Sequence, residues 1–357
     1  MLFSISVLIF SAVICFSGCT NDPIFATIEN EVELKDPSIT GNIYALVEYN
    51  GDLYAADGYL YRRNAGAGSW KKVKMPSGVT RCAGLAVDGA GLYGLFQNED
   101  WSFHSVQKYS AGTWDMVTGL PSISSGIDVA LGSGGTVIFA ATYNQTSRKT
   151  SVYKTTGAGA LTFDSTEVIT NAPIWKGSAG DYFATSNGIY DITGNVIVGG
   201  PTSGIRGIAL DEGGNHLYAV TSGNAYHYNI VTDTWDSPYN FNADYSAGGG
   251  LSILKAGTKN ILLIALTRGY WEVHLDDTTG ACVSRNAPGA NSNSSVKTGS
   301  EAQYDSSVGN YMVNRIYAVT SPVPAGNNYI VYAGISHRKY NGLWAYYSDT
   351  QTEWNRE

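Results

Sequence analysis

A unit of four short strands recurs along this chain, and its clearest copy occupies residues 204–238. The pattern predicts strands at 206–210, 216–221 and 225–229, with a fourth strand centred on Trp235. The predicted strands are rich in Val, Ile, Tyr and Leu, and glycine-containing turns separate them. One four-stranded sheet cannot bury both of its faces, whereas sheets stacked around an axis bury them against each other, as in a β-propeller.

Seven copies of the unit can be laid along the chain, which predicts an all-β fold with seven four-stranded propeller blades. Two copies are degenerate, so six or eight blades also fit the pattern. One further copy spans residues 251–284, without an assigned centre for its fourth strand. The other fourth strands are centred on Trp70, Trp114, Phe163, either Val196 or Ile197 in the weakest copy, Trp235 and Trp354.

The fourth-strand segments resemble those of a known repeat family. YNIVTDTWDSP, YSAGTWDMVTGLP and YSDTQTEWNRE are similar to the ends of Kelch-type repeats, over most of the chain. The paired glycines that Kelch repeats place after the second strand lie in the first turn here. The segment NAGAGSWKKV resembles a degenerate Asp-box of sialidase-type propellers without the Asp. These resemblances imply a propeller and no particular subfamily.

Residues 1–18 form an apolar run that ends at Cys19 and has no Lys or Arg near its start. The segment Phe16-Ser17-Gly18-Cys19 resembles a lipobox, the signal-peptidase site of bacterial lipoproteins, with Phe16 in place of the usual Leu. This resemblance implies a signal peptide at 1–18, a lipid on Cys19, a tether at 19–24 and one propeller domain at 25–357. The alternative is an ordinary signal peptide that leaves a free cysteine.

The residue after Cys19 is not Asp, which favours anchoring in an outer membrane, on either its periplasmic or its outer side. The segment at 25–34 resembles a strand that would complete the last blade. The end of the chain already supplies such a strand around Trp354, so either the N-terminal strand pairs outside it or the C-terminus frays.

The composition limits the classes of partner. A net charge of −8 without a basic stripe argues against nucleic acid. Beyond Cys15 and Cys19 the chain holds only Cys82 and Cys282, so no disulfide framework is expected and buried free thiols are the default. We expect a monomer.

Long insertions predict where a partner would bind. In a propeller the connections from second to third strands and from blade to blade share one face, and five long inserts fall there, at 97–105, 143–151, 239–249, 285–311 and 337–342. The opposite face has tight glycine turns, with 319–327 as the exception. Binding residues commonly lie on long loops of a rigid scaffold. The inserts carry the expected binding residues Trp101, Phe103, His104, Tyr143, Arg148, Lys149, Tyr239, Phe241, Tyr245, His337, Arg338 and Lys339.

Tyr, Trp and Arg dominate binding hot spots and suit stacking on sugars. The alternative for these aromatic residues is that they fold back as loop cores. The insert at 285–311 is rich in Asn, Ser and Gly, which is also typical of disorder.

Candidate catalytic residues are scarce. The five histidines are spread over four blades without metal-ligand spacing, although His227 and His274 fall on third strands of neighbouring blades. The paired carboxylates at 99–100 and 276–277 are adjacent in sequence and are expected to be solvated. No catalytic residue, metal site or cofactor is therefore predicted, and we expect a protein that is not an enzyme.

These observations predict a lipid-anchored, non-enzymatic propeller of the bacterial cell envelope that acts as a binding or scaffold module through its long-loop face. The partner would be another envelope protein, a host surface molecule or a glycan. One alternative is a carbohydrate-active propeller enzyme, similar to sialidases or lyases, which would need arginines converging at the channel mouth with a Tyr and carboxylates. Another is a scaffold for outer-membrane protein assembly.

Overall fold

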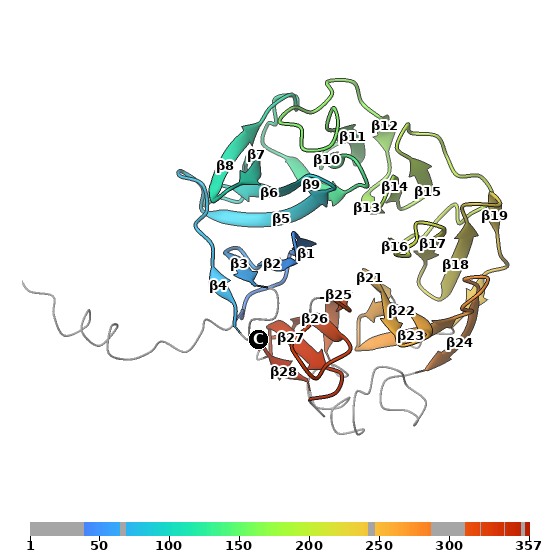
Figure 1. The fold of residues 1–357 in the computed structure, drawn as a ribbon. Coiled ribbons are helices and arrows are strands. Elements are labelled where there is room, and N and C mark those ends of the chain that lie inside the picture. The colour runs from blue at the N-terminus through green and yellow to red at the C-terminus, as the bar shows by residue number, and fades with distance from the viewer. Residues whose placement is uncertain are drawn as a thin grey trace, which may run out of the picture. The chain divides into compact units, whose positions relative to one another are not determined.

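Seven antiparallel sheets surround a common axis in the computed structural model of this chain (Figure 1). The structure describes residues 39–64, 69–241, 247–286, 311–321, 323–338, 340–350 and 354–357. The chain divides into the units Met1–Pro37 and Ser38–Glu357, and every described residue belongs to the second. The predicted lipidation site Cys19, the tether and the strand predicted at 25–34 lie outside the described residues.

Each blade begins with an innermost strand and proceeds outward. The innermost strands are β1 (Ala45–Tyr49), β5 (Arg81–Asp88), β9 (Ile127–Ser133), β13 (Trp175–Ala179), β16 (Gly207–Leu210), β21 (Ala247–Ala256) and β25 (Met312–Val319). The second strands are β2 (Asp52–Ala56), β6 (Gly91–Gln97), β10 (Ile138–Asn144), β14 (Tyr182–Thr185), β17 (His216–Val220), β22 (Lys259–Leu266) and β26 (Ile330–Ser336).

The third and outer strands complete the blades. The third strands are β3 (Leu60–Arg63), β7 (Phe103–Ser110), β11 (Lys149–Lys154), β15 (Gly188–Asp191), β18 (Asn224–Asn229), β23 (Tyr270–Leu275) and β27 (Gly342–Tyr347). The outer strands are β4 (Lys71–Lys72), β8 (Thr113–Val117), β12 (Ile169–Ala172), β19 (Thr234–Trp235), β20 (Tyr239–Asn240), β24 (Cys282–Asn286) and β28 (Asn355–Arg356). Both β19 and β20 pair with β18, at opposite ends of it.

Apolar cores between neighbouring blades hold the ring together. Seven buried clusters form, and each draws its side chains from two adjacent blades. The second strands lie in the middle of these cores, and the six residues from Ile261 to Leu266 in β22 are all buried. Strands buried on both faces need such continuous apolar runs. The predicted seven-bladed all-β propeller is confirmed, and six or eight blades are excluded.

Two predicted fourth strands are wrong in detail. In the third blade the outer strand is β12, whereas Phe163 lies in the connection before it and is buried between the second and third blades. The fourth blade has three strands. An isolated bridge from Tyr190 to Val196 and a hydrogen bond from the Ile197 amide to the Ile189 carbonyl at 2.9 Å mark the place of the expected fourth. In both cases the apolar residue is present but its backbone does not form a continuous ladder.

The last blade is completed by its own C-terminal strand, because β28 pairs with β27. The start of the described chain joins the same edge: the amide of Ile39 donates to the carbonyl of Glu357 at 2.8 Å, and the amide of Leu343 donates to the carbonyl of Ile39 at 2.9 Å. The described C-terminus is therefore paired rather than frayed. No helix among the described residues is long and apolar enough to span a membrane.

Candidate functional site

The connections between strands emerge on two faces of the ring. We call one the long-loop face; it carries the connections from second to third strands, such as β6–β7, β10–β11 and β26–β27, and those from blade to blade. We call the other the short-turn face; it carries the connections from first to second strands, such as β16–β17, and from third to fourth strands, such as β23–β24. The binding residues expected from the sequence belong to inserts of the long-loop face.

A rigid turn exposes Trp101 on the long-loop face. Its side chain is 54% exposed, and its backbone has a φ of 68°, a left-handed conformation that disfavours bulky residues. Asp100 Oδ1 accepts hydrogen bonds from the amide and the hydroxyl of Ser102 at 3.0 and 2.6 Å, and Asn98 Nδ2 donates to Ser102 Oγ at 2.8 Å. These bonds hold the backbone turn from which the exposed indole projects.

Arg81 supports the Trp101 ring from one side. Its guanidinium carbon lies 3.5 Å from the ring centroid, which is a cation–π contact. Arg81 is the first residue of β5, and its Nη2 donates to the Tyr44 hydroxyl at 3.3 Å. Tyr59, in the connection between β2 and β3, is 55% exposed on the same face. Neither Arg81 nor Tyr59 was expected from the sequence, because neither lies in a long insert.

Phe103 and His104 are half-buried and help to line a cavity of about 370 Å³ beside β8. His104 Nδ1 lies 2.9 Å from Ser105 Oγ. Tyr143 is half-buried in β10, whereas Arg148 is exposed in the β10–β11 turn with a φ of 57°. Of these four expected residues, Arg148 reaches furthest into solvent.

Phe241 does not reach the surface, contrary to expectation. Its side chain is 0% exposed and belongs to the core cluster between the fifth and sixth blades. The insert that was expected to project as a loop begins instead with β20, which extends the fifth blade and turns Phe241 inward. Tyr239, within β20, is half-buried and packs against the same cluster.

His337 lies in an aromatic stack. Its ring centroid is 4.1 Å from that of Tyr311 and 5.4 Å from that of Tyr340. This arrangement is the loop core that was the alternative to a binding role. Arg338 beside it is exposed. The expected residues Tyr245 and Lys339 lie outside the described part of the chain.

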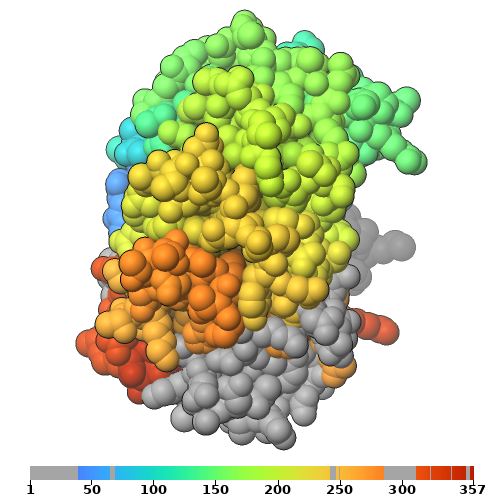
Figure 2. All heavy atoms as spheres, turned by 90° about the vertical axis from the view of Figure 1, so that its right-hand side faces the viewer, coloured from blue at the N-terminus to red at the C-terminus, as the bar shows by residue number. Residues whose placement is uncertain are grey.

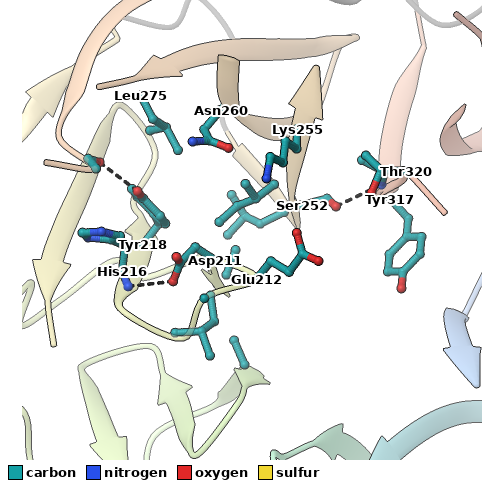
Figure 3. A pocket seen from close by; sticks show the side chains of 18 of the residues that line it. Asp211, Glu212, His216, Tyr218, Ser252, Lys255, Asn260, Leu275, Tyr317 and Thr320 are labelled. Carbon is teal, nitrogen blue, oxygen red and sulfur yellow. Dashed lines mark hydrogen bonds between the residues drawn. The ribbon is translucent and has the colours of Figure 1, made fainter. Parts of the chain in front are cut away.

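The short-turn face has a cavity of about 880 Å³ at the axis, which we call the axial cavity. Innermost strands of five blades line it, through Glu48, Ser178, Ile208, Ser252 and Tyr317 among others. Figure 3 shows Asp211, Glu212 and Lys255 around it, with the Tyr317 ring directed away from β25. A cavity of this size fits the range typical of small-molecule sites.

Carboxylates dominate the charge of the axial cavity, but two of them hold turns. Asp211 Oδ1 accepts the amides of Asn215 and His216 at 2.8 and 2.7 Å. Asp276 Oδ1 accepts the Thr279 amide at 2.8 Å, and hydrogen bonds from Thr279 and its neighbour lower the pKa of this carboxyl. Burial raises the pKa of Glu48. Asp276 therefore holds the β23–β24 turn, a role that was not part of the expectation that the pair at 276–277 is solvated.

A chain of hydrogen bonds leads outward from the axial cavity through the fifth blade. His216, which lines the cavity, has its Nδ1 2.9 Å from Nε2 of the buried His227, and His227 Nδ1 lies 2.7 Å from Asp236 Oδ2. A carboxylate only accepts, so Nδ1 of His227 carries the hydrogen. With His227 neutral, its Nε2 accepts from His216, which leaves His216 Nε2 as a proton acceptor.

We call His216, His227 and Asp236 the histidine relay, and the sixth blade packs against it. The Tyr218 hydroxyl donates to the Gly280 carbonyl at 2.8 Å, and the Tyr218 ring stacks on His227 with centroids 5.2 Å apart. Asp236 and His227 also line a smaller cavity of about 450 Å³, together with Cys282. Figure 2 views the ring from this side, where the fifth blade in yellow lies against the sixth in orange.

The described residues bear on two further kinds of chemistry, that of a metal site and that of a reactive thiol. Among them, no three His, Cys, Asp or Glu side chains are grouped so that they could hold a metal ion. Cys82 and Cys282 are free thiols, and burial raises the pKa of each to about 12. Neither sulfur is therefore a thiolate at neutral pH.

Comparison with known proteins identifies relatives along nearly the whole sequence. A model of the TP013X lipoprotein family matches residues 2–357. Three uncharacterized lipoproteins of Treponema pallidum (strain Nichols) are each 26% identical to the chain. The alignments cover 95%, 95% and 96% of this chain and 93%, 93% and 96% of the relatives.

Two solved structures share the fold at low sequence identity. A GH74 enzyme of Niastella koreensis superposes with a TM-score of 0.57 at 17% identity, over 89% of this chain and 54% of that one. The extracellular domain of a putative one-component system from B. thetaiotaomicron gives a TM-score of 0.50 at 16% identity, over 87% of this chain and 40% of that one. The chain thus spans about half or less of these two proteins, and the likeness concerns the fold alone.

Proposed function

The chain belongs to the TP013X lipoprotein family, and from this premise we propose that it is a non-enzymatic binding module whose long-loop face holds a protein or glycan partner. Membership of a lipoprotein family places it in the cell envelope with a lipid anchor. Within that setting, the lipid would be carried by Cys19 and the membrane would be the outer one. At least two acyl chains are needed for stable anchoring.

The observation that supports binding is the strained and exposed Trp101. A non-glycine residue at a φ of 68° persists only where its surroundings impose it, and such strain gathers at functional sites. The bonds of Asp100 and Asn98 to Ser102 supply that constraint. An indole held rigidly in solvent binds with little loss of side-chain entropy.

The test is in-cell crosslinking, affinity capture and mass spectrometry of the lipoprotein. Trp101→Ala is compared with Val231→Ala, because Val231 is 74% exposed in the β18–β19 turn of the short-turn face. A partner captured by the wild type and by Val231→Ala, but not by Trp101→Ala, supports the proposal. Equal capture by all three proteins would remove Trp101 from the binding site.

A second candidate function, acid–base catalysis in the axial cavity, is favoured by the relay. Asp236 and His227 orient His216 so that its Nε2 can accept a proton, as a general base must. Incubation with a panel of oligosaccharides would test this, with His216→Gln as the matched variant. Turnover that is lost in His216→Gln would establish the enzyme and displace the non-enzymatic proposal.

A further inference from the structure

Four cations lie at the starts of innermost strands or within their first residues. Arg81 begins β5, Lys176 is the second residue of β13, Arg206 directly precedes β16, and Arg315 lies in the first half of β25. The chain enters each innermost strand from the long-loop face, because the connection from the preceding blade arrives there. Figure 1 shows β5, β13, β16 and β25 around the axis, so these four positions lie near the ends of these strands that face the long-loop side.

Irregular pairing marks two of these positions. The register of β13 with β14 shifts between Trp175 and Gly177, so Lys176 is the extra residue of a β-bulge. The register of β25 with β26 shifts between Val313 and Arg315. Bulges re-aim side chains and are frequent beside functional sites.

Two of the arginines belong to strands that also reach the axial cavity. Arg206 directly precedes β16, and Arg315 lies within β25. The later residues of these two strands, from Ile208 to Leu210 and from Tyr317 to Val319, line the axial cavity. Protein surrounds Arg315 closely enough that burial lowers the pKa of its guanidinium, yet its side chain still reaches solvent.

These positive charges have no carboxylate partner among the described residues. The ion pairs found there join Arg62 to Asp52, Arg63 to Glu357 and His227 to Asp236. The guanidinium of Arg315 donates instead to backbone carbonyls, to Tyr44 at 3.3 and 3.2 Å and to Asn314 at 2.9 Å.

The positive charges of Lys176 and Arg206 repel each other. Burial and the neighbouring Arg206 both lower the pKa of Lys176. Cations that are partly removed from water and lack a counter-charge are costly, and an anionic ligand would relieve that cost. The protein as a whole has a net charge of −8, so this local excess of positive charge is opposite in sign to the charge of the whole chain.

Two of the four cations, Arg81 and Arg315, are linked by contacts to one another and to Trp101. Tyr44 links two of them, since its hydroxyl accepts from Arg81 and its carbonyl accepts from Arg315, and Arg81 also lies against the Trp101 ring. An exposed indole beside guanidinium groups suits a sugar ring that carries an anionic substituent, because the indole stacks on the ring and the fork of an Arg binds carboxylate or sulfate.

We propose that Arg81, Lys176, Arg206 and Arg315 form a site for the carboxylate or sulfate groups of an anionic saccharide, an inference that rests on the proposed binding function of the long-loop face. The saccharide stacks on Trp101 and directs its anionic groups toward the axis. An acidic protein segment would engage the same cations but would not need the indole, so it is an outcome of the test rather than the proposal.

The test is a calorimetric titration of the full-length lipoprotein in detergent. The probes are an oligogalacturonate, the same oligosaccharide with methyl-esterified carboxylates, dextran sulfate and neutral dextran. We expect binding of the acidic probes only, and the two acidic probes distinguish carboxylate from sulfate. The double variant Lys176→Gln, Arg206→Gln should bind roughly tenfold or more weakly, as charge-assisted hydrogen bonds predict.

Lys255→Gln is the matched control, because Lys255 is an exposed lysine of an innermost strand at the opposite end of the axis. It should bind the acidic probes as the wild type does. Unchanged affinity in the double variant, equal binding of the esterified probe, equal loss in Lys255→Gln or no binding of any saccharide would each overturn the anionic-saccharide site. In those cases, a captured protein partner that is lost in Trp101→Ala would still support the proposed function.

Discussion

Nη1 of Arg63, in the first blade, lies 3.0 Å from Oε2 of Glu357 at the end of the last blade. The two side chains are 4% and 9% exposed. The same carboxylate accepts the Trp70 indole N–H at 2.7 Å and the Tyr347 hydroxyl at 2.9 Å. The ring is thus closed by the buried Glu357 carboxylate, which accepts hydrogen bonds from both blades. The backbone hydrogen bonds of Ile39 with Glu357 and Leu343 add to this closure.

Replacing Glu357 by Gln should destabilise the ring. The change leaves the buried Arg63 guanidinium without its counter-charge, and breaking a buried pair in this way costs roughly 3–5 kcal/mol in the free energy of unfolding. Urea denaturation followed by circular dichroism measures it. The control is Arg62→Gln, which breaks the pair of Arg62 with Asp52; there Arg62 is 39% exposed, so about 1 kcal/mol or less is expected. Equal midpoints for the two variants would contradict the role of Glu357.

The fold could be predicted because the strands of a blade are short and separated by recognisable turns. The fifth blade was placed to within a residue or so, since Gly213 and Gly214 mark its first turn and the apolar residues continue on either side. Phe163 misled because an apolar residue fills the same inter-blade core whether it lies in a strand or in a connection. The spacing of apolar residues in the sequence indicates which side chains are buried. It does not show whether the backbone at those residues pairs with a neighbouring strand.

The candidate site was only partly predictable. Trp101 was selected because it lies in an insert, and its side chain is exposed. A sequence cannot show which residues of an insert pair back onto the sheet, and Phe241 was misjudged for that reason. Blade order put His227 and His274 on third strands of neighbouring blades but did not indicate His216 as a partner. The register that sets Tyr218 opposite His227 brings His216 diagonally next to His227. Arg81 and Arg315 converge only through ring closure, which joins residues far apart in the chain.

Gly280→Ala should disturb the histidine relay. A Cβ there would lie 2.6 Å from His216 Nδ1, so His216 must move and lose its bond to His227. Gly257→Ala is the matched control, because Gly257 also has a positive φ, 65° against 74°, but nothing lies within 4 Å of its Cβ position. Both changes cost about 1–2 kcal/mol of backbone strain, and Gly280→Ala should cost about 1–3 kcal/mol more in thermal or urea unfolding. Equal losses would show that His216 adapts freely.

The two thiols should resist alkylation in the folded protein. Cys82 is fully buried, Cys282 is half-buried, and burial raises the pKa of both to about 12, so the reactive thiolate is scarce at pH 8. Iodoacetamide labelling followed by mass spectrometry should modify neither thiol before unfolding and both after it. Rapid labelling of Cys282 in the native protein would indicate that the junction between the fifth and sixth blades opens.

Substitutions of Trp101 should separate backbone strain from binding. Trp101→Gly relieves the left-handed strain, whereas Trp101→Val keeps it and adds a β-branched side chain. We expect Trp101→Val to be less stable than Trp101→Gly by about 1–2 kcal/mol in urea, while both lose partner capture. If the two variants were equally stable, the turn would be able to change its conformation and would not be preorganised.

The turn that carries Trp101 should also respond to acid. Hydrogen bonds from the hydroxyl and the amide of Ser102 lower the pKa of Asp100 below its ordinary value of 3.8. Because the pKa is depressed in the folded state, the contribution of Asp100 is complete above pH 3.8 and is lost as the pH falls through the lower folded value. The ¹H–¹⁵N resonance of the Ser102 amide should shift in that range. Asp100→Asn, which cannot titrate, is the control, and a Ser102 resonance that titrates equally in the variant would assign the effect to another carboxyl group.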